Sequence, residues 1–483
     1  MTLAFSRYIA LLGIVTMAAC DATNPEAPNP CDVTPASCAA TLNADITASR
    51  TLYADTVYTL SSFVHVTGSG TVLTIEPGTV IEGTPGSALF ILQGAQIDAN
   101  GTAAAPIVFT SNQPANNRKP GDWGGLIIVG QGQINRSGTI QLEGTNTSDA
   151  NYVVNYSGGS VAGNTGSSGT LRYVRVEFAG FGPQPNQELN SFTFAAVGSG
   201  TTVEYVQALA GLDDSFEWFG GAVDGRYLVS YEAGDDHFDA SEGYLGRNQY
   251  LIGFQSVILD PVQGQGNLST DPQGFEVDGC GSASGGGCDL GFNSTPINTP
   301  MFANFTMVGT GQNDDVASTS GGVGLLLRRG TAGMYVNGVL ARWPRAAISL
   351  QNTETQTRFT SAEAILRNVL VVETGITAGT NAPLFESGSN RFTIDATAND
   401  ITSAAGAVTA ASVFTALPAT PANAASLDWS LPTASPARTG GTGAFTGALA
   451  TKGGTFVVGT AYVGAADPAA AKWWEGWTNY ARN

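Results

Sequence analysis

The sequence predicts an all-β protein built as one parallel β-solenoid, and three observations support this fold class. Glycine contributes 62 of the 483 residues, roughly 13% against a usual ~7%, and charged residues only 12% against a usual ~25%. From about residue 51, short β-rich runs alternate with Gly, Asn, Ser and Pro, and no helical periodicity is sustained before residue 360. The third observation is a direct repeat of these runs.

An aromatic residue marks each copy of the repeat. Tyr173, Tyr205, Tyr227 and Tyr250 occupy equivalent positions, at separations of 32, 22 and 23 residues. A minimum period near 22 with variable insertions suits one turn of a parallel solenoid, whose loops absorb length differences. Stacked turns pair each strand with the next about 4.8 Å away, and their corners favour glycine. A β-sandwich would share the short strands but not the direct repeat.

The N-terminus has the pattern of an export signal. Arg7 precedes a short apolar run at residues 8–15, and Met17-Ala18-Ala19-Cys20 resembles a bacterial lipobox, in which the cysteine is lipidated. An ordinary cleaved signal with a chance cysteine is the alternative. We expect a signal peptide at residues 1–19, a lipid anchor and flexible tether at 20–50, and a β-helix domain over 51–483. The lipid at Cys20 would hold the chain at a membrane, on the periplasmic side or exposed at the cell surface.

The remaining cysteines form two local pairs with short spacers. Because exported chains meet an oxidising compartment, we expect disulfides between Cys31 and Cys38 and between Cys280 and Cys288. Neither pair has the tight spacing of a zinc knuckle. With two histidines in the chain, zinc sites built on several histidines are nearly excluded.

One group of aligned acidic residues is a candidate for cation binding or acid catalysis. Aligning Phe216 with Phe238 at an offset of 22 residues also aligns three pairs of carboxylates. These pairs are Asp213 with Asp235, Asp214 with Asp236, and Glu217 with Asp239. A third, weaker copy of this run, at residues 274–279, adds Glu276 and Asp278. In-register stacking would hold like charges about 5 Å apart, where they repel by roughly 3 kcal/mol at an effective dielectric of 20.

Several interpretations of this acidic ladder remain open. A calcium ion would bridge the oxygens, so all six aligned acids are candidate metal ligands. Alternatively, arginines interleave with the acids, the candidates being Arg226, Arg247, Arg328 and Arg329. Some carboxyls would otherwise take raised pKa values and act as acids. In the simplest interpretation, the acids occupy corners, accept hydrogen bonds from backbone amides and point apart into water.

Several motifs resemble known families. Residues 73–81, 94–102, 106–111 and 121–128 resemble the opening turns of right-handed parallel β-helix proteins. Residues 213–221, 462–465 and 474–478 are similar to a family of β-helical outer-membrane lipoproteins from leptospires, Bacteroidetes and some proteobacteria. The resemblance covers about residues 50–480. It implies a single right-handed parallel β-helix at the outer membrane and, as a partner, an outer-membrane transporter.

The C-terminal part departs from the repeat. Residues 376–445 are rich in Ala, Thr and Pro, which indicates an excursion outside the solenoid with one short helix near Ala410. Aromatic residues follow at the end of the chain: Trp473, Trp474, Trp477 and Tyr480. We expect them to cap the last turn, because terminal repeats must cover an open edge. A platform for stacking sugars is the alternative.

The functional expectation is a ligand-binding surface lipoprotein. A net charge of −19 opposes binding to nucleic acid. No nucleophile elbow, Walker loop or dinucleotide fingerprint occurs in a suitable setting. The first alternative is a polysaccharide-degrading lyase or hydrolase that uses Asp213, Asp214, Glu217, Asp235 and Asp236 on a carbohydrate. Asp235-Asp236-His237 is superficially similar to pectin hydrolases, but their Gly-His-Gly and Arg-Ile-Lys segments are missing. The second alternative is a structural or adhesive envelope protein.

Overall fold

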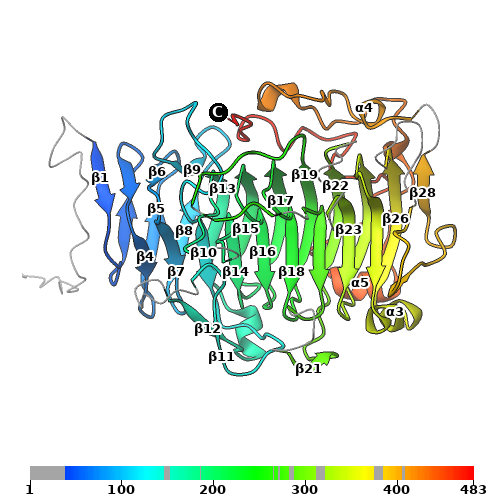
Figure 1. Cartoon of the computed structure of the whole chain (residues 1–483), viewed down its shortest axis with the longest axis horizontal. Coiled ribbons are helices and arrows are strands. Elements are labelled where there is room, and N and C mark those ends of the chain that lie inside the picture. Colours follow the sequence, from blue (N-terminus) through cyan, green and yellow to red (C-terminus); the bar gives the residue numbers. More distant parts are fainter. Residues whose placement is uncertain are drawn as a thin grey trace, which may run out of the picture.

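Parallel strands stacked along one axis form the body of the molecule (Figure 1). The computed structural model describes residues 38–145, 153–184, 187–264, 266–269, 272–281, 288–311, 321–374, 384–404 and 408–482. The signal peptide at residues 1–19, Cys20, Cys31 and the tether up to residue 37 lie outside these residues and stay predictions. Residues 39–42, expected in the tether, instead form a strand of the solenoid, which therefore begins before residue 51. Among the described residues, no helix is both long enough and apolar enough to cross a bilayer.

Two sheets contain nearly all the strands, and every strand pair in them is parallel except β25–β27. The larger sheet has 15 strands: β1 (Ala39–Leu42), β2 (Arg50–Leu52), β3 (Val57–Leu60), β5 (Val72–Ile75), β6 (Val80–Gly83), β8 (Gln96–Asn100), β9 (Ile107–Ser111), β13 (Gly169–Glu177), β15 (Thr202–Leu209), β17 (Asp224–Tyr231), β19 (Arg247–Phe254), β22 (Met301–Val308), β24 (Met334–Ala341), β26 (Ile365–Val372) and β28 (Ile401–Ala404). The second has ten: β4 (Phe63–Val66), β7 (Ala88–Ile91), β10 (Leu126–Val129), β14 (Phe192–Ala195), β16 (Phe216–Phe219), β18 (Phe238–Ser241), β20 (Phe275–Asp278), β23 (Val323–Arg328), β25 (Ala346–Gln351) and β27 (Arg391–Phe392). The chain passes from one sheet to the other in each turn, so the predicted parallel β-helix is confirmed.

Few elements lie outside these two sheets. The hairpin of β11 (Thr139–Gln141) and β12 (Asn155–Ser157) belongs to the insertion between β10 and β13. The strand β21 is short (Asp289–Phe292), and the α-helices of the described residues are α3 (Thr353–Thr360), α4 (Ala410–Val413) and α5 (Gly447–Gly453). The hairpin lies beside the second sheet (Figure 1), where it covers part of the site described below.

The 22-residue register is confirmed by the strand pairing. Phe216 of β16 lies opposite Phe238 of β18, and their ring centroids are 5.2 Å apart. Phe192 and Phe275 extend the same stack on either side, at 5.0 and 5.4 Å. All four rings are buried in the interior. Inward phenylalanines therefore set the register, and the residue after each of them points to the outer face of the sheet.

The repeated tyrosines lie at a corner within the long strands of the larger sheet. Tyr173, Tyr205, Tyr227 and Tyr250 have φ between 48° and 65°, in the left-handed region, so the strand bends there. Their rings stack at centroid distances of 4.5, 4.4 and 5.1 Å. Further along, asparagines take the same corner: Asn304, Asn337 and Asn368, with φ of 52°, 58° and 57°.

The C-terminal segment differs from the expected arrangement. Strands β27 and β28 lie within residues 376–445 and extend the two sheets, so this segment does not leave the solenoid throughout. The aromatic end covers a side of the solenoid, not the last turn: Trp477 O accepts a hydrogen bond from Arg175 Nη1 at 2.8 Å. Figure 1 shows the C-terminus above the middle of the long sheet. The reason is that aromatic side chains on the outer face of β13 to β19 offer apolar surface to be buried there.

Candidate acidic ligand site

A column of three acids runs across adjacent strands on the outer face of the ten-stranded sheet. Glu217 of β16 pairs with Asp239 of β18, and Asp239 pairs with Glu276 of β20. The column begins after Thr193 and ends before Leu326, which occupy the same position on the flanking strands. The predicted offset of 22 residues thus places Glu217 beside Asp239. Glu276, from the third copy of the run, lies directly beside Asp239.

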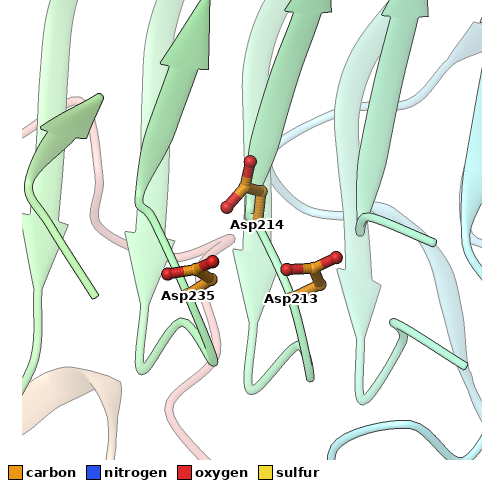
Figure 2. A group of neighbouring side chains, drawn as sticks. All are labelled: Asp213, Asp214 and Asp235. Carbon is orange, nitrogen blue, oxygen red and sulfur yellow. The ribbon is translucent and has the colours of Figure 1, made fainter. Parts of the chain in front are cut away.

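Four further acids lie at the corner before these strands. Asp214 Oδ1 accepts a hydrogen bond from the backbone N–H of Asp236 at 2.8 Å, and Asp236 Oδ1 accepts one from Gln273 N at 2.5 Å. Asp214 and Asp236 are buried. Each therefore ties its turn to the next, which is the corner role of the simplest interpretation. Asp213 and Asp235 lie at equivalent points of adjacent turns, with their carboxyl groups close together (Figure 2).

The carboxylates fall into three groups whose oxygens lie within 4.8 Å of one another. The groups are Asp213, Asp214 and Asp235; Asp214, Glu217 and Asp239; and Asp236, Asp239 and Glu276. Asp214 and Asp239 each belong to two groups, so the acids form one continuous patch. All six acids predicted from the sequence lie in this patch, and Glu276 is added to them.

A pocket of about 320 Å³ opens over the acidic column. Glu217, Asp239 and Glu276 form its floor, and Arg136, Glu143 and Tyr156 reach it from the insertion that carries the β11–β12 hairpin. Glu242, Asp278 and Arg329 complete the charged lining. The sequence prediction missed Glu143, Arg136, Tyr156 and Glu242. The first three lie in the insertion, which has no counterpart in the repeat, so an alignment of turns carries no signal for them. Glu242 follows β18 directly, where the aligned turn has Gly220, so the alignment shows no second acid there.

Burial raises the pKa of the ladder carboxyls. Loss of hydration raises the pKa of Glu217, and the nearby carboxyls of Glu143 and Asp239 raise it further. Burial likewise raises the pKa of Glu276 to about 8; Glu143 stays exposed at the pocket edge, and partial loss of hydration together with the neighbouring carboxyls raises its pKa to about 7. The pKa values of four further carboxyls are also raised, mainly by loss of hydration and then by repulsion from neighbouring acids. These are Asp213, Asp214, Asp236 and Asp239. The site therefore favours bound protons or a bound cation.

Two of the four candidate arginines meet the ladder. Arg328 forms ion pairs with Glu276 and Asp278, the latter at 2.8 Å, and Arg329 pairs with Asp278. The expectation for Arg226 and Arg247 is wrong. Arg247 pairs with Asp224 at 2.5 Å, and Arg226 lies 4.0 Å from the ring centre of Phe456. Both arginines belong to β17 and β19 of the other sheet, so they cannot interleave with these acids.

His237 does not belong to the pocket. Its side chain is buried, and Nδ1 lies 2.5 Å from Ser230 Oγ. Burial lowers the pKa of the imidazole to about 3. The similarity of Asp235-Asp236-His237 to a hydrolase motif therefore ends at the sequence, because this histidine faces the interior.

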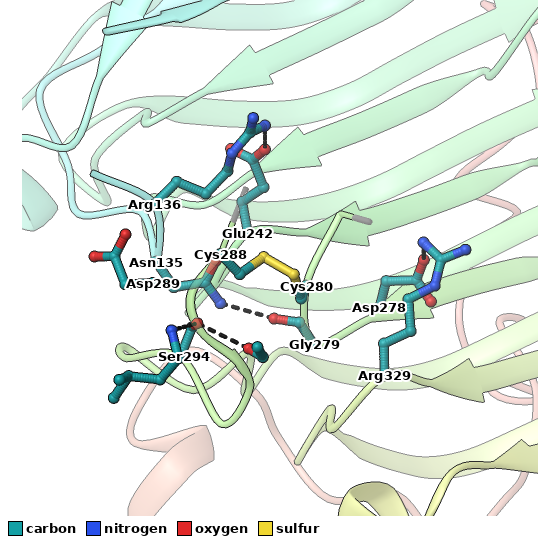
Figure 3. Close-up of a disulfide and its surroundings, with 12 residues drawn as sticks. Asn135, Arg136, Glu242, Asp278, Gly279, Cys280, Cys288, Asp289, Ser294 and Arg329 are labelled. Carbon is teal, nitrogen blue, oxygen red and sulfur yellow. Dashed lines mark hydrogen bonds and ion pairs between the residues drawn. A yellow bond between two sulfur atoms is a disulfide. The ribbon is translucent and has the colours of Figure 1, made fainter. Parts of the chain in front are cut away.

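A disulfide lies next to the pocket, whose lining includes the neighbouring Gly281. Cys280 and Cys288 are bonded, as predicted. Figure 3 shows that the disulfide lies between two ion pairs of the pocket lining, Arg136 with Glu242 and Arg329 with Asp278. Asn135 Nδ2 donates to Gly279 O at 2.7 Å, which holds the insertion against this corner. Cys38 is also in a disulfide, whereas its predicted partner Cys31 lies outside the described residues.

The fold and the pocket define a parallel β-helix protein with an acidic pocket on the outer face of one sheet. More narrowly, the chain belongs to the family of pectate-lyase-like β-helix domains, whose model matches residues 44–417. No curated protein and no solved structure matched the chain significantly. The expected β-helix family is confirmed, and the narrower lipoprotein assignment stays a prediction.

Proposed function

We propose that this protein binds a divalent cation, with calcium as the fitting ion, in the acidic pocket, and through that ion an acidic carbohydrate. The observation that carries the proposal is the alignment of Glu217, Asp239 and Glu276 on three adjacent strands. Asp239 Oδ1 is buried and accepts no hydrogen bond from the described residues. A buried carboxylate oxygen without a donor is costly, and a cation would remove that cost.

Calcium suits the donor set because it takes six to eight oxygen ligands in flexible geometry. At the pocket floor Asp239 Oδ1 has no hydrogen-bond donor among the described residues, and Glu217 has one oxygen that is not the acceptor of Asn190 Nδ2; Asp214 lies within reach of both. A bound ion would leave positions for oxygens of a ligand. Arg136 and Arg329 at the pocket walls would then face the carboxylate of a uronic acid residue.

The cellular setting completes the proposal. The lipobox at residues 17–20 and the polar tether after it support an exported protein held by lipid at Cys20 in the outer membrane, periplasmic or surface-exposed. In that position the protein would present captured carbohydrate to a transporter of the same membrane. The proposal of a transporter as partner rests on the resemblance to surface lipoproteins.

Cleavage of the polysaccharide is the second candidate function, and membership in a pectate-lyase-like family favours it. A lyase needs a base that removes a proton from the sugar beside the cation. Arg136 and Arg329 are the arginines of the pocket lining, and both form ion pairs, with Glu242 and Asp278. This pairing favours binding over cleavage. A structural or adhesive role stays the third possibility.

The test is calorimetric titration of the mature protein with calcium, followed by polygalacturonate. We expect calcium to bind and polygalacturonate to bind only with calcium present. Glu217→Gln with Asp239→Asn should abolish both, whereas Asp98→Asn, on an exposed strand position, should change neither. Absence of calcium binding would contradict the proposal. Ultraviolet-absorbing unsaturated products would show that the protein is a lyase.

A further inference from the structure

A second groove lies on the other sheet, at the tyrosine corner. Its volume is about 400 Å³, and the four stacked tyrosines form its floor. Trp473 and Trp477 of the C-terminal segment form a wall. The acidic pocket shares none of these lining residues, so the two sites are independent.

The groove exposes aromatic surface that the fold does not bury. Tyr173, Tyr205, Tyr227, Tyr250 and Trp473 are all half-buried. Elsewhere in the molecule large rings such as Trp123, Trp218 and Trp429 are fully buried. A contiguous exposed aromatic surface on a rigid scaffold is typical of a binding site.

The indoles of the wall are held in place before any ligand arrives. Trp473 Nε1 donates to Ala465 O at 2.9 Å, and Trp477 Nε1 donates to Trp473 O at 2.7 Å. Trp477 meets the rings of Tyr173 and Tyr205 edge to face, at centroid distances of 5.7 and 6.2 Å. Trp473 is tilted over Tyr227 at 5.2 Å. Fixed rings lose little entropy on binding, which increases affinity.

The charges around the groove select the class of ligand. Asp467, Lys472 and Glu475 lie at its rim. Lys472 already pairs with Asp428 at 2.8 Å and lies 3.9 Å from Glu475. The remaining rim is acidic, which disfavours anionic ligands. A neutral ligand with apolar C–H faces and many hydroxyls fits aromatic rings bordered by phenol groups.

We propose that this groove binds a neutral polysaccharide chain, laid along the solenoid axis across the tyrosine stack. The successive tyrosines are spaced by 4.5, 4.4 and 5.1 Å, about the length of one sugar residue in an extended glycan. Each turn would therefore contact one sugar through a tyrosine of the floor, and the half-buried Trp473 would pack on the chain from the wall.

The test uses tryptophan fluorescence and calorimetry of the mature protein with neutral oligosaccharides of increasing length from glucans, xylans, mannans and galactans. We expect one class to bind, with affinity rising up to about four sugar residues, one for each stacked tyrosine. Trp473→Ala should weaken binding about tenfold or more, equivalent to 1.4 kcal/mol. Tyr227→Phe, which keeps the ring stack, should weaken it less and serves as the variant that folds normally.

Chelation of calcium and the Glu217→Gln, Asp239→Asn variant should leave this binding unchanged, so the groove and the acidic pocket are tested separately. Three results would overturn the proposal. These are no binding by any of the four glycan classes, binding that Trp473→Ala and Tyr227→Phe both leave intact, and binding that a chelator abolishes.

Discussion

At the scale of single residues, the acids of the ladder have two different roles. Asp214 and Asp236 accept backbone hydrogen bonds from the following turn and so fix the corner. Glu217, Asp239 and Glu276 face the pocket instead. The roles follow from position: a corner acid lies beside the free N–H groups of the next turn, and an acid within a strand projects from the sheet.

Removing charge from the pocket floor should stabilise the protein in the absence of a cation. Repulsion between two carboxylates at the turn spacing is roughly 3 kcal/mol at an effective dielectric of 20. In chelator at pH 8, Glu217→Gln with Asp239→Asn should therefore raise the thermal midpoint. Added calcium should raise the midpoint of the natural protein but not that of the variant. Asp98→Asn is the control, and a lower midpoint for the double variant in chelator would refute the repulsion.

The corner acids should respond differently to amide and alanine substitution. Asp214→Asn keeps the Oδ1 acceptor for Asp236 N and removes a buried charge, so its free energy of unfolding should match or exceed that of the natural protein. Asp214→Ala leaves the buried N–H without its acceptor and should cost about 1–3 kcal/mol. Urea unfolding followed by circular dichroism measures the difference. Equal stabilities of the two variants would show that the hydrogen bond is unimportant.

At the scale of elements, the sequence specified the repeating turns much better than the segments between them. Phe216 and Phe238 predicted the register, because inward rings of adjacent turns must stack. The insertion with β11 and β12 brings Glu143 and Tyr156 to the pocket through contacts distant in sequence. Such contacts depend on tertiary packing, which leaves no periodic signal. For the same reason, the sequence did not predict that Trp477 packs against the side of the solenoid near Arg175.

The disulfide next to the pocket should contribute measurably to stability. It joins residues eight apart, and a closed loop of this size restricts the unfolded chain by about 2–3 kcal/mol at 25 °C. Cys280→Ser with Cys288→Ser should lower the urea midpoint accordingly. Because Gly279, next to Cys280, accepts a hydrogen bond from Asn135 of the insertion, calcium affinity should fall as well. Unchanged calcium affinity in the variant would show that the disulfide does not support the pocket.

At the scale of the whole molecule, the buried acids link folding to pH. Burial raises the pKa of Glu276 to about 8 and raises that of Glu217 well above the ordinary value of 4.5 expected in the unfolded chain. The native state therefore binds these protons more tightly than the unfolded state. Their contribution to stability is complete below pH 4.5 and is lost as the pH rises through the folded values.

In chelator, the free energy of unfolding should therefore decrease between about pH 5 and pH 8, by about 1.4 kcal/mol for each pKa unit of difference. Saturating calcium should flatten this decrease, because the ion replaces the protons. Urea titrations at each pH, with and without calcium, measure both effects. A stability that increases over this range in chelator would contradict the raised pKa values.

The return of the C-terminal segment to the middle of the solenoid has a consequence for biogenesis. Arg175 and Trp477 are partners although 302 residues separate them. As the polypeptide emerges in order, the turns from β13 to β19 are made long before the tryptophans that cover them. An interrupted or truncated product would therefore display bare rings along its flank, a mark by which proteases and chaperones can distinguish incomplete molecules from finished ones.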